Sequence, residues 1–184
     1  MATFYDALTD ELQVFIEQQP IFFTGSAPAD GRVNVSPKGM DSFRCFDART
    51  VGYLDVTGSG NEAAAHIGEN GRLTIMFCSF TRQTLILRLY GRGEVARRGT
   101  ARWAELIDRF TLLRGARQIV VLHIDSVQTS CGYAVPIMEY VRDRDTLVKW
   151  AGGQTDEELV AYRERKNTRS IDGLPTGSWL LEGH

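Results

Sequence analysis

Cysteine is scarce in this sequence, and its three cysteines lie far apart. Cys45, Cys78 and Cys131 form no CxxC pair and join no Cys/His cluster. Structural zinc sites need such clusters, and disulfide frameworks need an even, regularly spaced set. The sequence therefore predicts neither a metal site nor a disulfide framework. The apolar or small neighbours of Cys78 and Cys131 favour buried, reduced thiols.

Long apolar runs are also missing. No stretch approaches the roughly 20 residues that a membrane-spanning helix needs. The first twelve residues lack the basic region and the apolar region of a secretion signal. These absences predict a protein without a membrane partner, and a cytoplasmic location follows by default.

Signatures of hydrolytic catalysis are absent as well. The sequence has no GxSxG, no HExxH and no convincing Ser/His/Asp set. Of the three histidines, His66 is expected on a helix face or cap, His123 in a hydrogen-bonded strand position, and His184 is terminal. The sequence therefore names no catalytic side chain.

Lysine is the rarest charged residue, since Lys38, Lys149 and Lys166 stand against 18 arginines. The 21 basic and 23 acidic residues give a formal net charge of −2, yet residues 81–117 hold nine arginines and three acids. Such a stretch in a mildly acidic chain favours anion binding, whereas a protein that coats nucleic acid is basic overall. We expect no nucleic-acid partner. The arginines from Arg97 to Arg117 are expected on a turn and an outer helix, facing water or acids.

The residues that are present describe short strands with short connections. A length of 184 residues, with 43% hydrophobic and 24% charged, corresponds to one ordinary domain. Apolar patterns predict helices at 6–18, 61–69 and 100–113, and strands at 21–24, 32–36, 42–46, 51–56, 73–80, 84–96 and 118–127. This pattern predicts an α+β fold with a closed or half-closed antiparallel sheet.

The C-terminal part has a different pattern. Residues 131–184 are predicted to be a helical extension on a barrel core of residues 1–130, within a single domain. Helices are expected over 138–150 and 156–167, the second opened by a capping box with Thr155 as N-cap. An irregular end rich in glycine follows.

The most informative motif lies between two of the predicted strands. Gly58-x-Gly60-x-x-Ala63 matches the dinucleotide fingerprint. Glycines let a backbone approach a phosphate, and a helix start offers free N–H groups and the positive end of its dipole. The helix is too short for an ordinary βαβ crossover, and Arg82 rather than an acid follows the next strand. A phosphate loop of another kind is favoured, with a Rossmann domain and a plain tight turn as alternatives.

Two further stretches place charge near strands. Ser36 and Lys38 follow a predicted strand, and Pro37 is expected to form a turn. The lysine either supplies charge to an anion or is a solvated turn residue. Along 85–93, polar and apolar residues alternate, and an inward-facing arginine is costly unless paired. Arg88 therefore points at water or meets an anionic ligand or a buried carboxylate.

Together these pieces resemble the FMN-binding split-barrel superfamily, the pyridoxamine 5′-phosphate oxidase-like flavoproteins. The matching segments are RVNVSPKGMDSF (32–43), TVGYLDVTGSGNEAAAHI (50–67), RLTIMFCSF (72–80) and LILRLYGRGEV (85–95). Their order and spacing are distinctive, although no single motif is diagnostic. The resemblance implies a six- to seven-stranded antiparallel split β-barrel with flanking helices. It also implies a homodimer that holds FMN in a groove at its interface.

The resemblance also implies roles for particular residues. The FMN phosphate would be held by Ser36 and Lys38, with hydroxyl, amide or backbone contacts from Thr57, Ser59, Gly60 and Asn61. Residues near the ring or the ribityl chain would be Met76, Cys78 and Arg88. The implied function is hydride transfer between FMN and a small organic substrate, for which no side-chain nucleophile is required.

The chain departs from the vitamin B6 oxidases proper. Those enzymes carry Ser-Arg-Lys where this chain has Asn61-Glu62-Ala63, and their C-terminal substrate segments are absent. Pyridoxamine phosphate is therefore not the expected substrate. The chain is more similar to an uncharacterised branch with an SPKG turn and a CGYxVP segment. Two alternatives remain: a deazaflavin (F420) reductase on the same barrel, and a non-catalytic flavin- or haem-binding protein.

Overall fold

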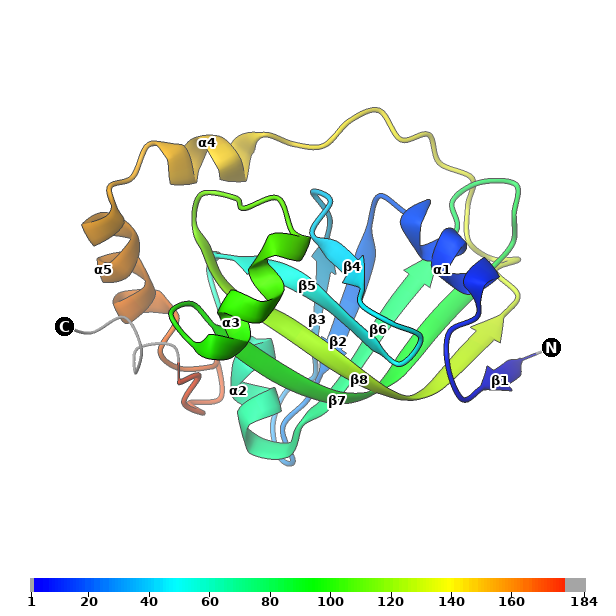
Figure 1. The fold of residues 1–184 in the computed structure, drawn as a ribbon, viewed down its shortest axis with the longest axis horizontal. Coiled ribbons are helices and arrows are strands. Elements are labelled where there is room, and N and C mark those ends of the chain that lie inside the picture. Colours follow the sequence, from blue (N-terminus) through cyan, green and yellow to red (C-terminus); the bar gives the residue numbers. More distant parts are fainter. Residues whose placement is uncertain (1, 178–184) are drawn as a thin grey trace.

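The computed structural model describes residues 2–177, which form one curled antiparallel sheet with helices at its ends and on its faces (Figure 1). The strands are β1 (Thr3–Tyr5), β2 (Phe22–Ser26), β3 (Asn34–Lys38), β4 (Phe43–Cys45), β5 (Thr50–Val56), β6 (Arg72–Cys78), β7 (Ile86–Arg97) and β8 (Ala116–Ser130). The helices are α1 (Asp10–Glu17), α2 (Glu62–Asn70), α3 (Ala101–Leu106) with the 3₁₀ turn η1 (Ile107–Arg109), α4 (Thr146–Gly152) and α5 (Asp156–Lys166).

The sheet is a half-barrel with the strand order β3-β2-β6-β7-β8-β5-β4, and β1 pairs with the far end of β8. All the strand pairs are antiparallel. The predicted split-barrel class is confirmed, and β1 is a short strand that the sequence pattern did not indicate. No helix within residues 2–177 has the length and the apolarity that a membrane crossing would require.

The long strands β7 and β8 bend where their register shifts, between Tyr90 and Gly91. A Cβ added at Gly91 would collide with the backbone carbonyl of His123 on β8. The two backbones can approach this closely only because Gly91 has no side chain. The bend curls the sheet around its apolar interior.

Alternating side chains on the strands feed two separate cores. Val120 and Leu122 of β8 join the larger cluster inside the curl, which α1 covers. Ile119 and Val121 face the other way and pack beneath α3, where Trp103 is buried. The central strands are therefore buried on both faces over part of their length, which explains their long apolar runs.

Helix α2 connects β5 to β6 and ends at Gly71, whose φ of 74° is left-handed. The buried His66 on this helix shares a 2.9 Å hydrogen bond between its Nδ1 and the Oγ of Ser26 on β2. This contact holds α2 against the inner side of β2. The helix therefore starts beside the edge strand β3, next to the motif that the sequence singled out.

Several local predictions are wrong in instructive ways. Pro37 does not form a turn, because β3 continues through it to Lys38. β3 is an edge strand, where a residue without an N–H costs no ladder hydrogen bond. The helix expected over 100–113 ends at Arg109 with η1, and Cys131 is exposed rather than buried.

The C-terminal extension contains less helix than predicted. The helix expected over 138–150 is only α4, which begins at Thr146. Residues 136–145 are irregular and exposed, so their apolar side chains have no core to pack against in this chain. Helix α5 starts where predicted, with its Thr155/Glu158 capping box intact.

Candidate functional site

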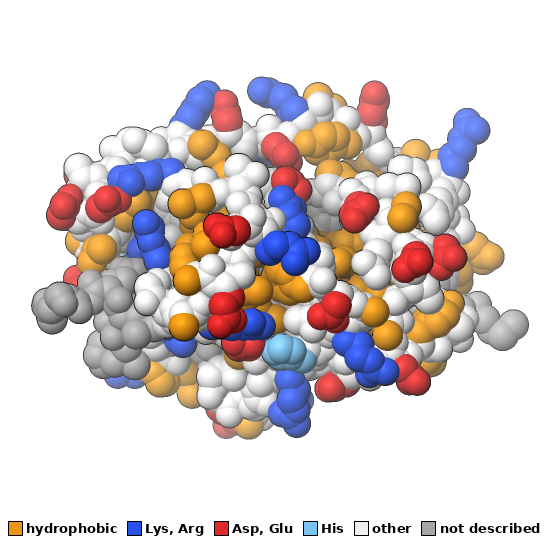
Figure 2. All heavy atoms as spheres, viewed as in Figure 1, with side chains coloured by type: hydrophobic (Ala, Val, Ile, Leu, Met, Phe, Trp, Pro, Cys, Tyr) orange, Lys and Arg blue, Asp and Glu red, His pale blue; other side chains and the backbone are white. Residues whose placement is uncertain are grey.

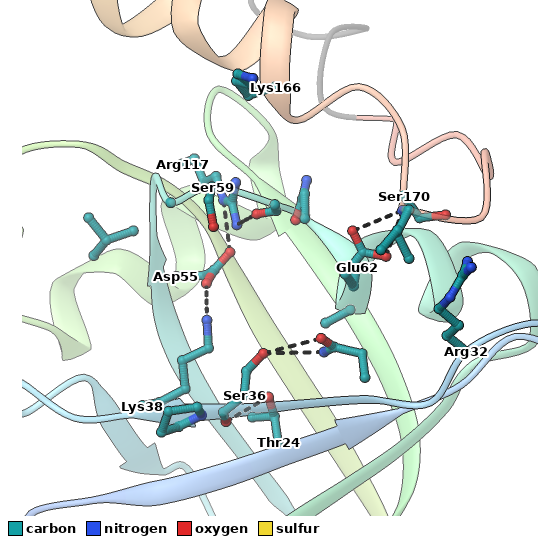
Figure 3. A pocket seen from close by; sticks show the side chains of 18 of the residues that line it. Thr24, Arg32, Ser36, Lys38, Asp55, Ser59, Glu62, Arg117, Lys166 and Ser170 are labelled. Atoms are coloured by element: carbon teal, nitrogen blue, oxygen red, sulfur yellow. Dashed lines mark hydrogen bonds and ion pairs between the residues drawn. The ribbon is translucent and has the colours of Figure 1, made fainter.

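A cavity of about 720 Å³ opens where β3, the loop after β5, the start of α2 and the C-terminal segment meet (Figure 3). This volume falls within the range of small-molecule sites. The residues that line it are Thr24, Arg32, Val33, Asn34, Ser36, Pro37, Lys38, Asp55, Val56, Gly58, Ser59, Gly60, Asn61, Glu62, Ala63, Arg117, Lys166, Arg169, Ser170 and Ile171. Five of these side chains are cationic and two are acidic, so the cavity favours an anion.

The charged centre of the cavity is one carboxylate shared by two cations. Lys38 on β3 donates from Nζ to Oδ1 of Asp55 at 2.7 Å, and Arg117 on β8 donates from Nε to Oδ2 at 2.9 Å. Burial raises the pKa of Asp55, but the charges of Arg117 and Lys38 outweigh it and hold this pKa well below its usual range. Asp55 is therefore ionised at neutral pH, and the group of three carries one surplus positive charge.

Arg117 also supports the loop that follows β5. Its Nη1 donates to Oδ1 of Asn167 at 2.7 Å, and its Nη2 donates to the carbonyl of Gly60 at 2.9 Å. The expectation that Arg117 lies on a turn or an outer helix and faces water or acids is wrong in its placement, because β8 begins at Ala116 and puts Arg117 in the cavity wall. The acid that it meets there is Asp55 of the same chain. The sequence signal was available, since Arg117 and Gln118 are polar at the start of an apolar strand.

The amide of Asn61 is oriented by its neighbours. Gln118 donates from Nε2 to Oδ2 of Asp55 at 2.9 Å and to Oδ1 of Asn61 at 2.8 Å. Because its oxygen accepts that bond, Asn61 presents its Nδ2 as a donor. Only 3% of Asn61 is exposed, and this Nδ2 has no hydrogen-bond partner in the part of the chain that the structure describes. An unused buried donor in a cavity wall calls for an acceptor on a ligand.

The remaining predicted phosphate contacts lie in or behind the same wall. Ser36 faces the cavity and exchanges hydrogen bonds of 3.3 and 3.4 Å with the side chain of Asn34. Ser59 and Gly60 line the cavity at the loop. Thr57 lies behind the loop, where its Oγ1 donates to the carbonyl of Gly115 at 2.8 Å.

The C-terminal segment forms one wall of the cavity. Arg163 on α5 is buried and donates from Nε to Oγ1 of Thr57 at 2.8 Å. The Nδ2 of Asn167 donates to the carbonyl of Gly58 at 3.1 Å, and the backbone N–H of Ile171 donates to the carboxylate of Glu62. The extension, which the resemblance did not explain, thus packs directly on the loop of the predicted site.

Three predicted site residues lie elsewhere in the chain. Met76 on β6 and Arg88 on β7 face each other in register on the outer side of the sheet, and Cys78 follows on the same side. The Nη1 of Arg88 donates to Oγ of Ser130 at 3.1 Å. Burial raises the pKa of the Cys78 thiol. The structure therefore brings the predicted phosphate residues together but leaves these three residues on the opposite face of the sheet.

The cavity is equipped to bind an oxyanion, and its two acidic residues, Asp55 and Glu62, belong to no cluster of metal ligands among the described residues. Its donors include the ammonium of Lys38, the hydroxyl of Ser36 and the oriented amide of Asn61. The start of the nine-residue helix α2 adds backbone donors, since its N-cap residue makes no side-chain capping bond. No group of three possible metal ligands occurs among residues 2–177. The lining residues include neither histidine nor cysteine, so they offer no side chain typical of a haem axial ligand.

Comparisons with known proteins agree on one family and one fold. A family model described as pyridoxamine 5′-phosphate oxidase matches residues 8–131, which are the barrel without the C-terminal segment. The pyridoxamine 5′-phosphate oxidase family protein ustO of Aspergillus flavus is 40% identical over an alignment of 193 residues, which covers 95% of this chain and 78% of that protein.

Solved structures share the fold at lower identity. HupZ of Group A Streptococcus superposes with a TM-score of 0.51 at 23% identity, over 65% of this chain and 91% of that chain. A pyridoxamine 5′-phosphate oxidase-type protein of Lactobacillus delbrueckii superposes with a TM-score of 0.54 at 22% identity, over 67% of this chain and 94% of that chain. At these identities the superpositions establish the half-barrel architecture alone.

Proposed function

Because the chain belongs to the pyridoxamine 5′-phosphate oxidase family, we propose that it is a flavoprotein that binds FMN with its phosphate in the cavity described above. The observation that carries the proposal is the unpartnered amide of Asn61, which lies in the wall of the same cavity as the ammonium of Lys38. Both groups donate hydrogen bonds, and both line one cavity with surplus positive charge. A phosphate monoester supplies the acceptors and the negative charge that they lack.

The cavity supports a phosphate in three additional ways. Ser36 offers a hydroxyl, the loop through Gly58 and Gly60 lets backbone come close, and α2 directs its N-terminal end into the cavity. Hydrogen bonds to an ionised group are roughly twice as strong as neutral ones. Asp55 holds Lys38 in place without cancelling the whole charge, because Arg117 shares the carboxylate.

We further propose an oxidoreductase that transfers a hydride between FMN and a small organic substrate. Bound FMN would supply this redox chemistry. The protein's own residues would orient the cofactor through the phosphate cavity and exclude water from it. Ser170 and Ile171 of the C-terminal segment form part of the cavity wall.

The placement of the predicted residues supports a homodimer with FMN at its interface. The phosphate residues lie on the inner side of the sheet, whereas Met76 and Arg88 lie on its outer side. A flavin that touches both sets needs the cavity of one protomer and the outer face of another. The cytoplasmic location and the absence of nucleic-acid partners stay predictions.

The test is a visible spectrum followed by titration with FMN and with riboflavin, which lacks the phosphate. We expect flavin bands in the purified or reconstituted protein and at least about tenfold tighter binding of FMN than of riboflavin. Lys38→Ala should weaken FMN binding and leave riboflavin binding unchanged. The exposed Lys149→Ala on α4 is the matched control and should bind FMN normally.

Other outcomes reassign or remove the proposal. A protein that FMN cannot colour is not a flavoprotein of this kind. Equal affinity for FMN and riboflavin would show that the cavity does not hold the phosphate. Binding of the deazaflavin F420 that FMN does not displace would transfer the assignment to an F420-dependent reductase.

A further inference from the structure

The last residue of α5 and the segment after it border the cavity, and we name residues 166–171 the tail wall. Figure 3 shows Lys166 and Ser170 of the tail wall on the side of the cavity opposite Lys38. Two residues of the tail wall, Lys166 and Arg169, are cationic and line the cavity. Both lie beyond the region that the family model matches. The tail wall therefore adds positive charge to the cavity from a part of the chain to which the family match assigns no role.

The backbone of the tail wall is held in place by specific contacts. Asn167 is fully buried, and its Nδ2 donates to a carbonyl of the loop after β5 at 3.1 Å. Ile171 donates its backbone N–H to the carboxylate of Glu62 at 3.0 and 3.2 Å. The first contact directly follows Lys166, and the second comes two residues after Arg169. Both cations are thus carried at the cavity rim by an ordered backbone, which lowers the entropy lost when a ligand binds there.

The carboxylates near the cavity already have other partners. Asp55 is shared by Lys38 and Arg117. The carboxylate of Asp172 pairs with Arg32, and that of Glu62 accepts the backbone N–H described above. None of these acids is left to compensate a further cation.

Lys166 and Arg169 form no ion pair within residues 2–177. Arg169 donates from Nη1 to the carbonyl of Gly173 at 2.8 Å, which leaves its other guanidinium donors for a ligand. Both side chains are exposed and can change rotamer to reach an anion in the cavity. The positive charge of the tail wall is therefore available to a ligand.

The start of α2 makes such charge necessary. The first turn of this helix contains the acidic Glu62 and no basic residue. An anion that accepts from the free N–H groups of the helix start also meets the negative field of that carboxylate. Cations on the facing wall offset this repulsion.

The uneven charge is a property of the cavity. On the face of the molecule in Figure 2, basic and acidic side chains are interspersed, so that this face has no large patch of a single sign. The cavity lining, in contrast, has five cationic and two acidic side chains. A small anion that enters the cavity fits this distribution, whereas a long polyanion needs an extended basic surface.

We propose that Lys166 and Arg169 bind the phosphate of the ligand from the tail wall, opposite Lys38. The ammonium supplies a point charge, and the guanidinium can donate two parallel hydrogen bonds to phosphate oxygens. The inference rests on the proposed phosphate site and adds two binding residues to it. The C-terminal extension is then part of the binding site as well as a support for its loop.

The first test needs no variant, because the chain contains only three lysines. An N-hydroxysuccinimide ester acetylates exposed lysines, and mass spectrometry measures the rate at each one. Saturating FMN should slow acetylation of Lys38 and Lys166 by at least about fivefold. Lys149, which is exposed on α4 and does not line the cavity, is the internal control and should react at the same rate. Protection of Lys38 without protection of Lys166 would overturn the proposal.

The second test removes the two charges. Lys166→Ala/Arg169→Ala should raise the dissociation constant of FMN by at least about tenfold and leave riboflavin binding unchanged. The melting temperature without ligand should not change, because both side chains are exposed. The charge-conserving Lys166→Arg/Arg169→Lys should bind FMN within about threefold of the wild type.

The matched control is Arg142→Ala/Arg144→Ala. It removes the same charge from an exposed part of the same extension that does not line the cavity. It should bind FMN as the wild type does. If the control weakens FMN binding as much as the tail-wall variant, the effect belongs to net charge and the proposal fails.

Inorganic phosphate separates this proposal from the flavin assignment. If FMN does not bind but phosphate protects Lys166 from acetylation, the flavin assignment fails and the tail-wall site stands. If FMN binds and Lys166→Ala/Arg169→Ala binds it as tightly as the wild type, the tail-wall site fails and the flavin assignment stands. If neither FMN nor phosphate protects Lys166, the tail-wall site fails as well.

Discussion

Asp55 is shared by two cations that reach it from different strands, Lys38 from β3 and Arg117 from β8. Only 5% of the Arg117 side chain is exposed, so it depends on the carboxylate for its counter-charge. Removing one partner of a buried ion pair leaves the other charge uncompensated, which costs more than the pair contributes. This carboxylate is therefore a structural element of the cavity as well as an electrostatic one.

Asp55→Asn should lower the free energy of unfolding at pH 7 by about 3–5 kcal/mol. The folded pKa of Asp55 lies well below the ordinary value, so its stabilisation is complete above the unfolded pKa and declines as the pH falls. Below about pH 4 the difference in free energy of unfolding between the wild type and Asp55→Asn should shrink by about 1.4 kcal/mol per pH unit. The decline should stop once the pH reaches the pKa of Asp55 in the folded state.

Urea unfolding at pH 7 and pH 3 measures this difference. The advantage of the wild type over Asp55→Asn should be about 1 kcal/mol smaller at pH 3. Asp30→Asn, at an exposed aspartate, should change the free energy by less than about 0.5 kcal/mol at both pH values. A pH-independent advantage would show that Asp55 is not held ionised.

Asn61→Asp keeps the oxygen that accepts from Gln118 and replaces the free donor by a negative oxygen. It should weaken FMN binding by at least about tenfold, because the phosphate then meets a carboxylate instead of a donor. Riboflavin binding should not change, and calorimetric titration with both ligands gives the comparison. If the two ligands weaken equally, the amide does not face the phosphate.

Part of this site could be predicted from residue types alone. Lys38 and the loop from Ser59 to Asn61 stood out because lysine is rare here and glycines flank a helix start. Arg117 was assigned to the turn and outer helix because the predicted strand began only at residue 118, whereas β8 begins at Ala116. Side-chain pairing between β3, β5 and β8 depends on strand order, which a single sequence does not reveal.

At the level of helices and strands, Gly91 and Gly68 differ in the space that a side chain would find, and substitutions at both test whether the bend between β7 and β8 needs a glycine. A Cβ at Gly91 would collide with the carbonyl of His123, whereas a Cβ at Gly68, exposed on α2, meets nothing within 4 Å. Gly91→Ala should lower the free energy of unfolding by at least about 2 kcal/mol. Gly68→Ala should raise it by about 0.5–1 kcal/mol, because alanine favours a helix interior.

Thermal and denaturant unfolding of Gly91→Ala and Gly68→Ala measure these changes in the free energy of unfolding. A neutral Gly91→Ala would mean that the bend between β7 and β8 does not depend on a missing side chain. A destabilising Gly68→Ala would mean that α2 is packed on the side that the structure leaves open.

The elements that sequence patterns predicted well are those whose burial repeats regularly. The strands near 51–56, 73–80 and 84–96 alternate or run apolar because they face cores. The prediction of a helix over 138–150 is wrong before Thr146, because the apolar side chains of residues 136–145 pack on no core of this chain. An apolar pattern identifies residues that need a partner, but it does not say whether that partner belongs to the same chain.

Across the whole molecule, the residues predicted to line one groove lie on two opposite faces of the sheet. The half-barrel class followed from the number, length and spacing of the strands. The placement of the site residues on two faces could not be predicted in this way. It depends on which side of β3 and of β6 each side chain faces once the sheet has curled. Lys38 and Met76 are predicted for one ligand yet lie on opposite sides of the sheet.

The cavity is also assembled from distant parts of the chain, and its last wall comes from residues 166–171. During synthesis the barrel strands leave the ribosome before α5, and domains fold progressively from the N-terminal side. The nascent barrel can therefore form while the phosphate loop is still uncovered. Loading of the proposed flavin would then be a late step of biogenesis. A chain stalled before Arg163 would be a barrel that lacks the contact between Arg163 and Thr57.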